Sequence, residues 1–371
     1  MLMEYIPFLK PKVVPKQYYQ RYLDEIDESR IYTNNGPLNK RFEERILKEH
    51  FNHTGAVVTV SNATIGLLLA ISQLKRQGKY ALMPSFTFPA TPLSAMWCGL
   101  EPYYIDIDPE HWCMDEHKLE LALEKLGDEA AVVVPYATFG TQLDLAYYES
   151  LIRRGIPVVI DAASSFGTTM EEQDLTSFGG AIVYSFHATK SFGIGEGGIV
   201  YSGDLELIQS IRRSTNFGFN EERSSGQLGL NGKISEYTAA VGLATLDVFS
   251  EKIKIREKIG EWYKEALNDY KLLESGWKVQ AIAGKIVNQF YPILCPVDQE
   301  NRFYVDKLQA LAIQVRTYFS PPCHRQKMFD YHPRTSLAVT EEISRRILSL
   351  PVWEDIRKEQ VERIVRSLIH E

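Results

Sequence analysis

Cysteine is scarce in this chain, and long apolar runs are absent from it. The 371 residues include four cysteines (Cys98, Cys113, Cys295 and Cys323), and none of them forms the CxxC pair of a zinc module or small redox site. We therefore expect reduced thiols and no metal site. No stretch approaches the ~20 apolar residues that span a bilayer, and the start, MLMEYIPFLKPK, lacks the features of a secretory signal. These absences favour a cytoplasmic protein without a membrane partner.

Positive charge is not in excess either. The sequence has 41 Lys and Arg against 48 Asp and Glu, a net charge of −7, which disfavours a general nucleic-acid binder. Its 24 glycines and 17 prolines are too few for a collagen-like or low-complexity chain. Hydrophobic residues make up 44% and charged residues 24%, the balance of a soluble globular protein. At about 150 residues per domain, the length allows two domains.

Short apolar runs alternate with helical patterns over the first two-thirds of the chain. The runs are rich in β-branched residues and do not alternate with polar ones, as expected for strands buried on both faces. Repeated strand–helix units predict an α/β fold with a mostly parallel sheet between layers of helices. The predicted strands span residues 56–60, 80–84, 102–105, 131–135, 157–160, 181–185 and 198–201.

The pattern changes near residue 246. A long amphipathic helical pattern at 239–267 is followed by a strand pattern at 285–297, a helix at 302–312, a strand at 314–319 and two final helices, which is typical of a smaller α+β domain. Three prolines near the start disfavour helix there and suggest an extended arm. We therefore predict an arm at 1–15, a large α/β domain at 16–250 and a small C-terminal domain at 251–371.

Polar residues follow several of the predicted strands, at the edge where ligands bind in open α/β sheets. The turn Ser61-Asn62-Ala63-Thr64 opens a helix, so its free N–H groups could bind an anion, although for the turn taken alone simple N-capping is favoured. Asp161 closes a buried strand and needs a cationic or hydrogen-bonding partner, unless it only caps the next segment.

The segment after the strand at 181–185 carries the most specific signal. Lys190 follows Ser185 in a short loop and precedes glycines that match neither a Walker loop nor a GxGxxG fingerprint. A lysine in such a site can form a Schiff base with a carbonyl cofactor. Pyridoxal phosphate (PLP) needs N–H donors for its phosphate, a carboxylate such as Asp161 for its pyridine nitrogen and a lysine for its aldehyde. Phe88 could stack on the ring, although for this residue taken alone a plain core position is favoured.

At these residues the chain resembles the DegT/DnrJ/EryC1/StrS aminotransferases, the nucleotide-sugar branch of the fold type I PLP enzymes. The block SFHATKSFGIGEGG from Ser185 to Gly198 is the most specific part of the resemblance. The resemblance runs over nearly the whole length and includes Asn35-Gly36-Pro37, Ser61-Asn62-Ala63-Thr64, PSFTFPAT from Pro84 to Thr91, YIDID from Tyr104 to Asp108, Asp161-Ala162-Ala163, GLNGKISEYTAA from Gly229 to Ala240 and Ser349-Leu350-Pro351.

The resemblance implies roles for matching positions. Lys190 carries the cofactor as a Schiff base and then moves the proton, and Asp161 pairs with the pyridine nitrogen. Phosphate ligands come from the N–H groups of Ala63 and Thr64 and from the hydroxyls of Thr64 and Ser185, while Phe88 covers one ring face. Asn231 matches the asparagine that reaches the phosphate of the partner subunit, which implies a homodimer with shared sites.

Three departures from the family pattern bear on the substrate and the phosphate turn. Ser164 stands where relatives commonly carry Gln or His beside the cofactor's phenolic oxygen, and serine is too short for the same contact. Lys233 replaces the usual arginine and loses its bidentate fork. Ala63 replaces a glycine, which is tolerable if its φ is negative.

Three further side chains are weaker candidates for substrate contact. Tyr318 and His324 fall where the small domain of relatives approaches the substrate, and simple packing against the large domain explains them equally well. His187 lies in the lysine turn, where packing or hydrogen bonding is favoured over acid–base work.

The resemblance therefore predicts a PLP-dependent aminotransferase. Its substrates would be an amino-acid donor, with L-glutamate favoured, and a nucleotide-linked 3-keto- or 4-keto-6-deoxy sugar, for polysaccharide or glycoside biosynthesis. One alternative is other PLP chemistry, such as sugar dehydration; relatives that are dehydratases have histidine in place of the lysine, so Lys190 favours transamination. A non-enzymatic regulator is a second alternative, which the complete pair of Lys190 and Asp161 disfavours.

Overall fold

The strands of the larger domain form a mixed sheet close to the one predicted. The computed structural model describes residues 4–168, 175 and 178–369, so residues 1–3 of the predicted arm lie outside the described part. The strands are β1 (Ala56–Val60), β2 (Tyr80–Pro84), β3 (Glu101–Ile105), β4 (Ala130–Val133), β5 (Val159–Asp161), β6 (Ala181–Ser185), β7 (Gly198–Ser202), β8 (Lys278–Val279), β9 (Tyr291–Leu294) and β10 (Ile347–Leu350).

Two hydrogen-bonded groups of strands make up this sheet. One has the order β1-β7-β6-β5 and the other the order β3-β2-β4, and parallel bridges from Val133 to Val158 and from Tyr136 to Asp161 join β4 to β5. In this sheet β7 runs antiparallel to both of its neighbours, whereas β5 and β6, and β2 with β3 and β4, pair in parallel. Every residue of β6 is buried, as expected for a strand covered on both faces.

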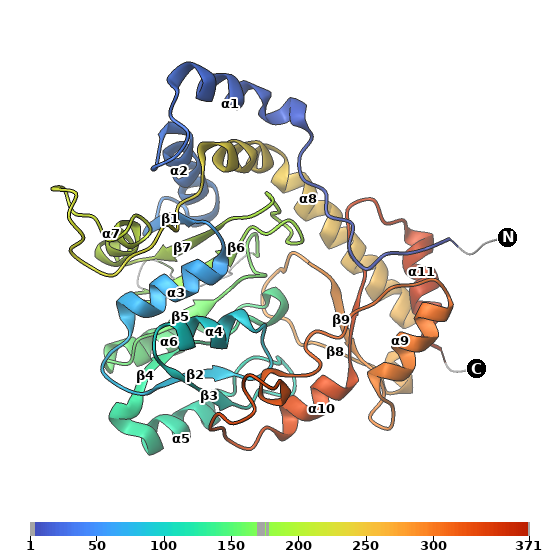
Figure 1. Cartoon of the computed structure of the whole chain (residues 1–371). Helices are drawn as coiled ribbons and strands as arrows, with labels where there is room; N and C mark the ends of the chain where they lie inside the picture. The colour runs from blue at the N-terminus through green and yellow to red at the C-terminus, as the bar shows by residue number, and fades with distance from the viewer. Residues whose placement is uncertain (1–3, 169–174, 176–177, 370–371) are drawn as a thin grey trace.

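Helices cover both faces of the sheet and continue into the C-terminal domain (Figure 1). They are α1 (Lys16–Ser29), α2 (Pro37–Phe51), α3 (Ala63–Leu74), α4 (Ala90–Trp97), α5 (Glu116–Leu126), α6 (Leu145–Arg153), α7 (Leu205–Ser214), α8 (Glu236–Asp269), α9 (Asn301–Ala310), α10 (Ala338–Arg346) and α11 (Lys358–Arg366). Gly66 lets α3 lie close to the sheet, because a Cβ at this position would lie 2.8 Å from Val183. The described residues include no helix both long enough and apolar enough to cross a membrane.

The long helix α8 connects the two parts of the chain. It packs against α1 and α2 near its start and against α11 farther along, and in Figure 1 it runs diagonally from the top of the molecule toward the right-hand side. Leu246 and Phe249 belong to the core of the large domain, whereas Ile259 and Tyr263 belong to the C-terminal core. The boundary predicted at residue 250 therefore falls inside one continuous helix, and the division into domains stays a prediction.

Two strand predictions for the C-terminal domain are wrong in extent. Of the pattern at 285–297, only Tyr291–Leu294 forms strand β9, because the residues before it turn their polar groups toward the large domain. The pattern at 314–319 makes only an isolated bridge, between Arg316 and Ser349. Conversely, the structure contains β10, which the sequence pattern does not predict and which pairs antiparallel with β9.

A buried carboxylate fastens the C-terminal domain to the sheet. Asp106, which follows β3, accepts hydrogen bonds from the backbone N–H groups of Val339 and Thr340 in the first turn of α10, at 3.2 and 2.8 Å. It also accepts one from Lys118 Nζ at 2.9 Å. Burial alone would raise the pKa of Asp106, but the bonds from Lys118 and Thr340 outweigh it and hold the pKa below its usual value.

Replacing this carboxylate tests its contribution to stability. We expect Asp106→Asn to lower the free energy of unfolding by about 2–4 kcal/mol, because Lys118 and the α10 N–H groups lose a buried charge. Asp144→Asn, at the exposed N-cap of α6, is the matched control and should change it little, because Asn caps as well as Asp. Chemical denaturation at neutral pH measures both.

The comparison of wild type with Asp106→Asn also predicts how stability depends on pH. Since the folded-state pKa of Asp106 is depressed, its contribution is present above the ordinary aspartate value of 3.8 and disappears as the pH falls through the folded value. The stability difference between wild type and Asp106→Asn should therefore shrink on acidification. A difference that stays constant down to acid unfolding contradicts this assignment.

Candidate functional site

The predicted site residues meet at one edge of the sheet. Strands β1, β2, β5 and β6 all end at this edge. Strands β1 and β6 both run opposite to β7, and β5 pairs in parallel with β6. Strand β2 is parallel to β4, which parallel bridges join to β5. The start of α3, the segment after β2, Asp161 and Ser185 therefore lie at the same carboxyl edge. The turn that carries Lys190 connects β6 to β7 beside them.

Asp161 is a buried carboxylate, and the described groups that donate hydrogen bonds to it are all neutral. Its Oδ2 accepts a hydrogen bond from Thr91 Oγ1 at 2.7 Å, and its Oδ1 accepts one from the N–H of Ala163 at 3.1 Å. Thr91 is held in turn by Thr87, at 2.7 Å between the two hydroxyls. No described residue forms a salt bridge with Asp161, and burial raises its pKa. A protonated ring nitrogen fits this position, because it would supply the missing cation.

Lys190 lies in a tight turn and points toward two polar side chains. Its N–H donates to the carbonyl of His187 at 2.8 Å, which closes the turn. Its Nζ donates to Ser164 Oγ and to Gln289 Oε1, each at 3.2 Å, and Ser164 Oγ donates to the same Gln289 oxygen at 3.1 Å. Burial lowers the pKa of Lys190 to about 8, partly offset by the charge of Asp161. An amine with this pKa is more available for attack on a carbonyl than an exposed lysine.

Gln289 is the functional candidate that the sequence did not single out. It lies two residues before β9, inside the run that the pattern predicts as a strand, and it is buried. The only signal in the sequence is a neighbouring pair of amides, Asn288 and Gln289, within an apolar stretch. Buried amides need partners, so such a pair can indicate a site.

The start of α3 has the geometry of an anion site. The side chain of Asn62 caps the N–H of Ile65 at 3.0 Å, which leaves the N–H groups of Ala63 and Thr64 at the end of the helix without a carbonyl partner in the helix. Ala63 is the first helical residue and does not have a positive φ, so alanine is tolerated there. Both N-capping and phosphate binding are thus compatible with this turn.

Glycine at position 198 brings Ser185 close to this helix start. Gly198 pairs with Ser185 across β6 and β7, and a Cβ on it would lie 3.1 Å from the nitrogen of Ala63 and 2.6 Å from the carbonyl oxygen of Tyr184. The Ser185 hydroxyl accepts a hydrogen bond from the N–H of His187 at 3.4 Å. The serine and the helix start can therefore serve one phosphate group.

Phe88 lies on the segment between β2 and α4 and is 56% exposed. It is adjacent to Thr87, whose hydroxyl hydrogen-bonds the hydroxyl of Thr91, and Thr91 donates to Asp161. The plain core position is therefore wrong for this side chain, and its role as a ring-stacking residue remains a prediction. An aromatic face left open next to the carboxylate is compatible with it.

The three weaker candidates have different surroundings. His187 Nδ1 contacts the hydroxyl of Thr189 at 2.8 Å within the turn. Both ring nitrogens of buried His324 are engaged, by Ser85 at 2.7 Å and Glu341 at 3.1 Å, so this side chain fastens the C-terminal domain to the segment after β2. Tyr318 packs on Phe290, with ring centroids 5.5 Å apart, next to Gln289.

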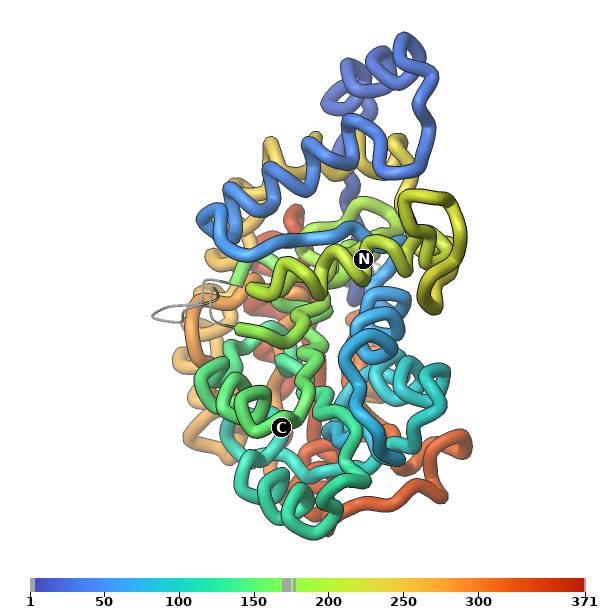
Figure 2. Tube along the Cα trace, turned by 90° about the vertical axis from the view of Figure 1, so that its left-hand side faces the viewer, coloured from blue at the N-terminus to red at the C-terminus, as the bar shows by residue number. Residues whose placement is uncertain are grey.

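Asn231 and Lys233 flank Gly232, whose carbonyl accepts a hydrogen bond from the N–H of Ser61 at 2.7 Å, next to the start of α3. Lys233 Nζ donates to the side-chain oxygens of Asn231 at 2.9 Å and Asn216 at 2.6 Å. They line a polar cavity of about 500 Å³, which also includes Thr33, Asn34, Phe217, Phe219, Asn220 and Arg223. The segment after α7 that forms part of this cavity projects from the body of the molecule in both Figure 1 and Figure 2. Asn231 makes no described contact with Lys190 or Ser185 of its own chain.

Comparison with known proteins agrees with this arrangement. The model of the DegT/DnrJ/EryC1/StrS aminotransferase family matches residues 16–369. A solved Bacillus cereus structure, of a protein assigned as a PLP-dependent aminotransferase, is 50% identical, covers 98% of this chain and 100% of its own, and superposes with a TM-score of 0.96.

Two further relatives are named for sugar substrates or products. The structure of DesI in the presence of its TDP-sugar product is 30% identical, with a TM-score of 0.87, and the match covers 99% of this chain and 93% of that one. The dTDP-4-amino-4,6-dideoxy-D-glucose transaminase of Shigella dysenteriae is 28% identical over 97% of both chains. Together with the match along nearly the whole sequence, these findings show that this PLP-dependent enzyme belongs to the DegT/DnrJ/EryC1/StrS aminotransferase family.

Proposed function

We propose that this enzyme transfers the amino group of L-glutamate to the keto carbon of a nucleotide-linked 3-keto- or 4-keto-6-deoxy sugar. The observation that carries the proposal is the partly buried amine of Lys190 held at the same sheet edge as the buried carboxylate of Asp161. The sugar class is supported by the relatives named for a TDP-sugar product and a dTDP-aminosugar. A product of this class would serve polysaccharide or glycoside biosynthesis, and the free thiols of the four cysteines support a cytoplasmic location.

The residues of the site have separate tasks in this proposal. PLP supplies the electron sink that lets an amino acid and a keto sugar exchange an amino group. The N–H groups of Ala63 and Thr64, with the hydroxyls of Thr64 and Ser185, bind its phosphate, and Phe88 covers one face of its ring. Asp161 keeps the ring nitrogen protonated, because a buried carboxylate favours a cation beside it.

Lys190 Nζ moves the proton in this mechanism. Its lowered pKa, about 8, leaves more of the amine neutral near neutral pH than an ordinary lysine would have. The nitrogen can therefore take a proton from the α-carbon of the donor and pass it to the carbon that takes up the amino group. Ser164 and Gln289 orient this nitrogen through their hydrogen bonds. His187 and Tyr318 remain proposed substrate contacts. His324 has its ring nitrogens engaged by protein groups, so we propose that its contribution is indirect.

We further propose a homodimer in which Asn231 completes the phosphate site of the partner subunit. Asn231 and Lys233 line a polar cavity whose lining does not include their own Lys190. Large apolar side chains are exposed around this region, including Phe217 at 46% and Leu228 at 80%. A second copy of the chain would cover such side chains.

A visible absorption spectrum tests the donor and the lysine together. PLP-loaded protein should show a band near ~420 nm that moves toward ~330 nm when L-glutamate is added, because the cofactor accepts the amino group. Lys190→Ala should lose the lysine-bound band, whereas Lys10→Ala, a lysine on the N-terminal segment, should keep it. A band that ignores glutamate would refute this donor, and product analysis with a keto sugar separates amination from dehydration.

The pKa of Lys190 predicts how cofactor uptake depends on pH. The neutral amine attacks the aldehyde, so the rate at which cofactor-free protein takes up PLP should rise with pH and level off above about 8, where Lys190 titrates. An ordinary lysine would instead titrate at 10.5. Stopped-flow absorbance across this range measures the midpoint, and a midpoint near the ordinary value contradicts the burial argument.

Complementation tests the shared site. Co-expressed Lys190→Ala and Asn231→Ala chains should form hybrid dimers with one intact site, and the mixture should regain about a quarter of wild-type activity. The intact site combines Lys190 of one chain with Asn231 of the other. Each variant alone, measured at the same total concentration, is the control. Hybrid dimers without this gain would show that both residues act within one chain.

A further inference from the structure

Gln289 contacts Lys190 through a side-chain amide whose N–H₂ group has no role in the site described so far. Its side-chain oxygen faces the lysine ammonium, which can only donate, so the acceptor end of the amide points at the lysine. The same oxygen accepts the hydroxyl of Ser164. The amide nitrogen, in contrast, donates to no residue that the structure describes. A buried amide with an unused donor beside a reactive lysine is suited to bind an oxygen atom of a ligand.

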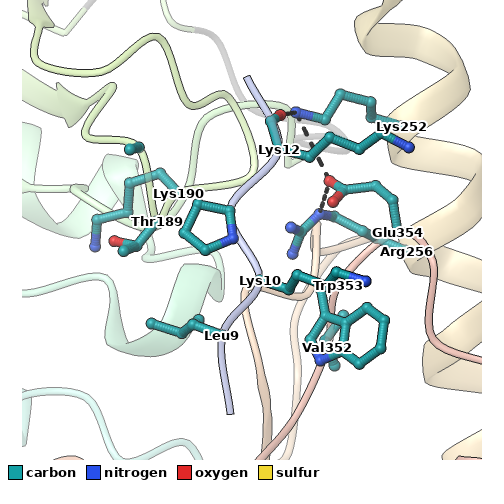
Figure 3. Close-up of a pocket in the computed structure, with 12 residues that line it drawn as sticks. Leu9, Lys10, Lys12, Thr189, Lys190, Lys252, Arg256, Val352, Trp353 and Glu354 are labelled. Atoms are coloured by element: carbon teal, nitrogen blue, oxygen red, sulfur yellow. Dashed lines mark hydrogen bonds and ion pairs between the residues drawn. The ribbon is translucent and has the colours of Figure 1, made fainter. Parts of the chain in front are cut away.

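The backbone that carries Gln289 is held in place by α8. Arg256 Nη1 donates to the carbonyl of Asn288 at 2.7 Å, and Arg256 Nε contacts Glu354 at 3.0 Å. Lys252 also approaches Glu354, at 3.7 Å. Figure 3 shows this cluster on one side of the N-terminal segment 9–12, with Lys190 on the other side. A buried ion pair of this kind fixes geometry more than it adds stability.

The helix and an aromatic residue hold both sides of this backbone. A Cβ on Gly260 of α8 would lie 2.6 Å from the amide nitrogen of Asn288, so the helix runs close to the segment. On the other side, Phe290 packs on Phe139 and Phe8, with ring centroids 4.9 and 6.1 Å away. Gln289 is therefore supported on both sides of the chain and presents its amide from a rigid base.

The chemistry of PLP indicates which ligand oxygen Gln289 meets. The ring carbon that bears the aldehyde is next to the ring carbon that bears the phenolic hydroxyl, so a cofactor linked to Lys190 Nζ brings that oxygen beside the lysine nitrogen. Ser164 and Gln289 are the described side chains that hydrogen-bond this nitrogen. Once the lysine is no longer an ammonium, the Gln289 oxygen loses its strongest donor, and the amide can turn its N–H₂ to the phenolic oxygen.

We propose that Gln289, on the segment before β9, is a positioning residue that binds the phenolic oxygen of PLP together with Ser164. In this way a long amide compensates for the short serine at position 164. The inference rests on the proposed link between Lys190 and PLP. Donation to the phenolic oxygen stabilises its anionic form and draws electron density from the lysine-bound nitrogen, so this nitrogen loses its proton at a lower pH than it would otherwise.

A spectroscopic pH titration of the PLP-loaded enzyme tests this role. Gln289→Leu keeps the size of the side chain but removes both amide groups, and we expect the midpoint of the visible spectral transition to rise by about one pH unit. Gln289→Glu offers only acceptors when ionised and should shift it further in the same direction. The matched control is Gln280→Leu, because Gln280 is also buried but donates to the carbonyls of His111 and Thr138.

A second substitution tests whether the lost contact to the phenolic oxygen can be restored. Adding Ser164→Gln to Gln289→Leu should bring the midpoint back toward the wild-type value, because a long amide then approaches the same oxygen from the other side. If Gln289→Leu lowers the melting temperature as Gln280→Leu does but leaves the midpoint unchanged, the residue is only structural and the inference is overturned. If wild-type protein takes up no PLP on Lys190, both the proposed function and this inference fail. Should Gln289→Leu not fold, the Glu variant decides the same question.

Discussion

The unpaired buried charge at the carboxyl edge of the sheet is the constraint on which the site depends. Asp161 is placed there by β5, and its neutral partners leave it short of a cation among the described residues. Lys190 is close enough for its charge to act on Asp161, but its hydrogen bonds go to Ser164 and Gln289. Burial thus pushes both groups toward their neutral forms. A cofactor with a basic ring nitrogen and an aldehyde suits both groups, because the protonated nitrogen pairs with Asp161 and the aldehyde reacts with the neutral amine of Lys190.

The sheet edge that hosts these groups follows from strand direction. Because β1, β2, β5 and β6 end on the same side, residues distant in sequence meet without any need for long loops. Strand β7, which runs antiparallel to both of its neighbours in this sheet, returns the chain directly after the lysine turn. This return lets Gly198 pair with Ser185 and approach the start of α3.

Much of this arrangement could be predicted from the sequence because strands buried on both faces leave a clear apolar pattern. The strands at 56–60, 80–84 and 181–185 have the predicted bounds, and the predicted α/β class and cofactor are confirmed. The C-terminal domain was harder, because its strands are short and their pairing is non-local. The segment at 285–290 is apolar enough to resemble a strand, yet Asn288 and Gln289 make their contacts with α8 and the large domain.

The site itself could be predicted only where the residues are adjacent in sequence to a strand end. Lys190, Asp161 and Ser185 met that condition, whereas Gln289 reaches the lysine from 99 positions away along the chain. Such a contact depends on how the C-terminal domain docks, and no local pattern records it. For the same reason, the engagement of both His324 nitrogens by protein groups could not be predicted from the residues around it, 316–324.

The continuous helix α8 limits how this enzyme can move. Leu246 and Phe249 are anchored in one core, and Ile259 and Tyr263 in the other, with unbroken helix between them. A sharp kink about residue 250 would have to interrupt helical hydrogen bonds, so α8 resists a large independent rotation of the two cores. Closure over a substrate therefore costs less in the segments beside the helix than in the helix itself. Access to the site is thereby separated from the rigid frame that aligns its groups.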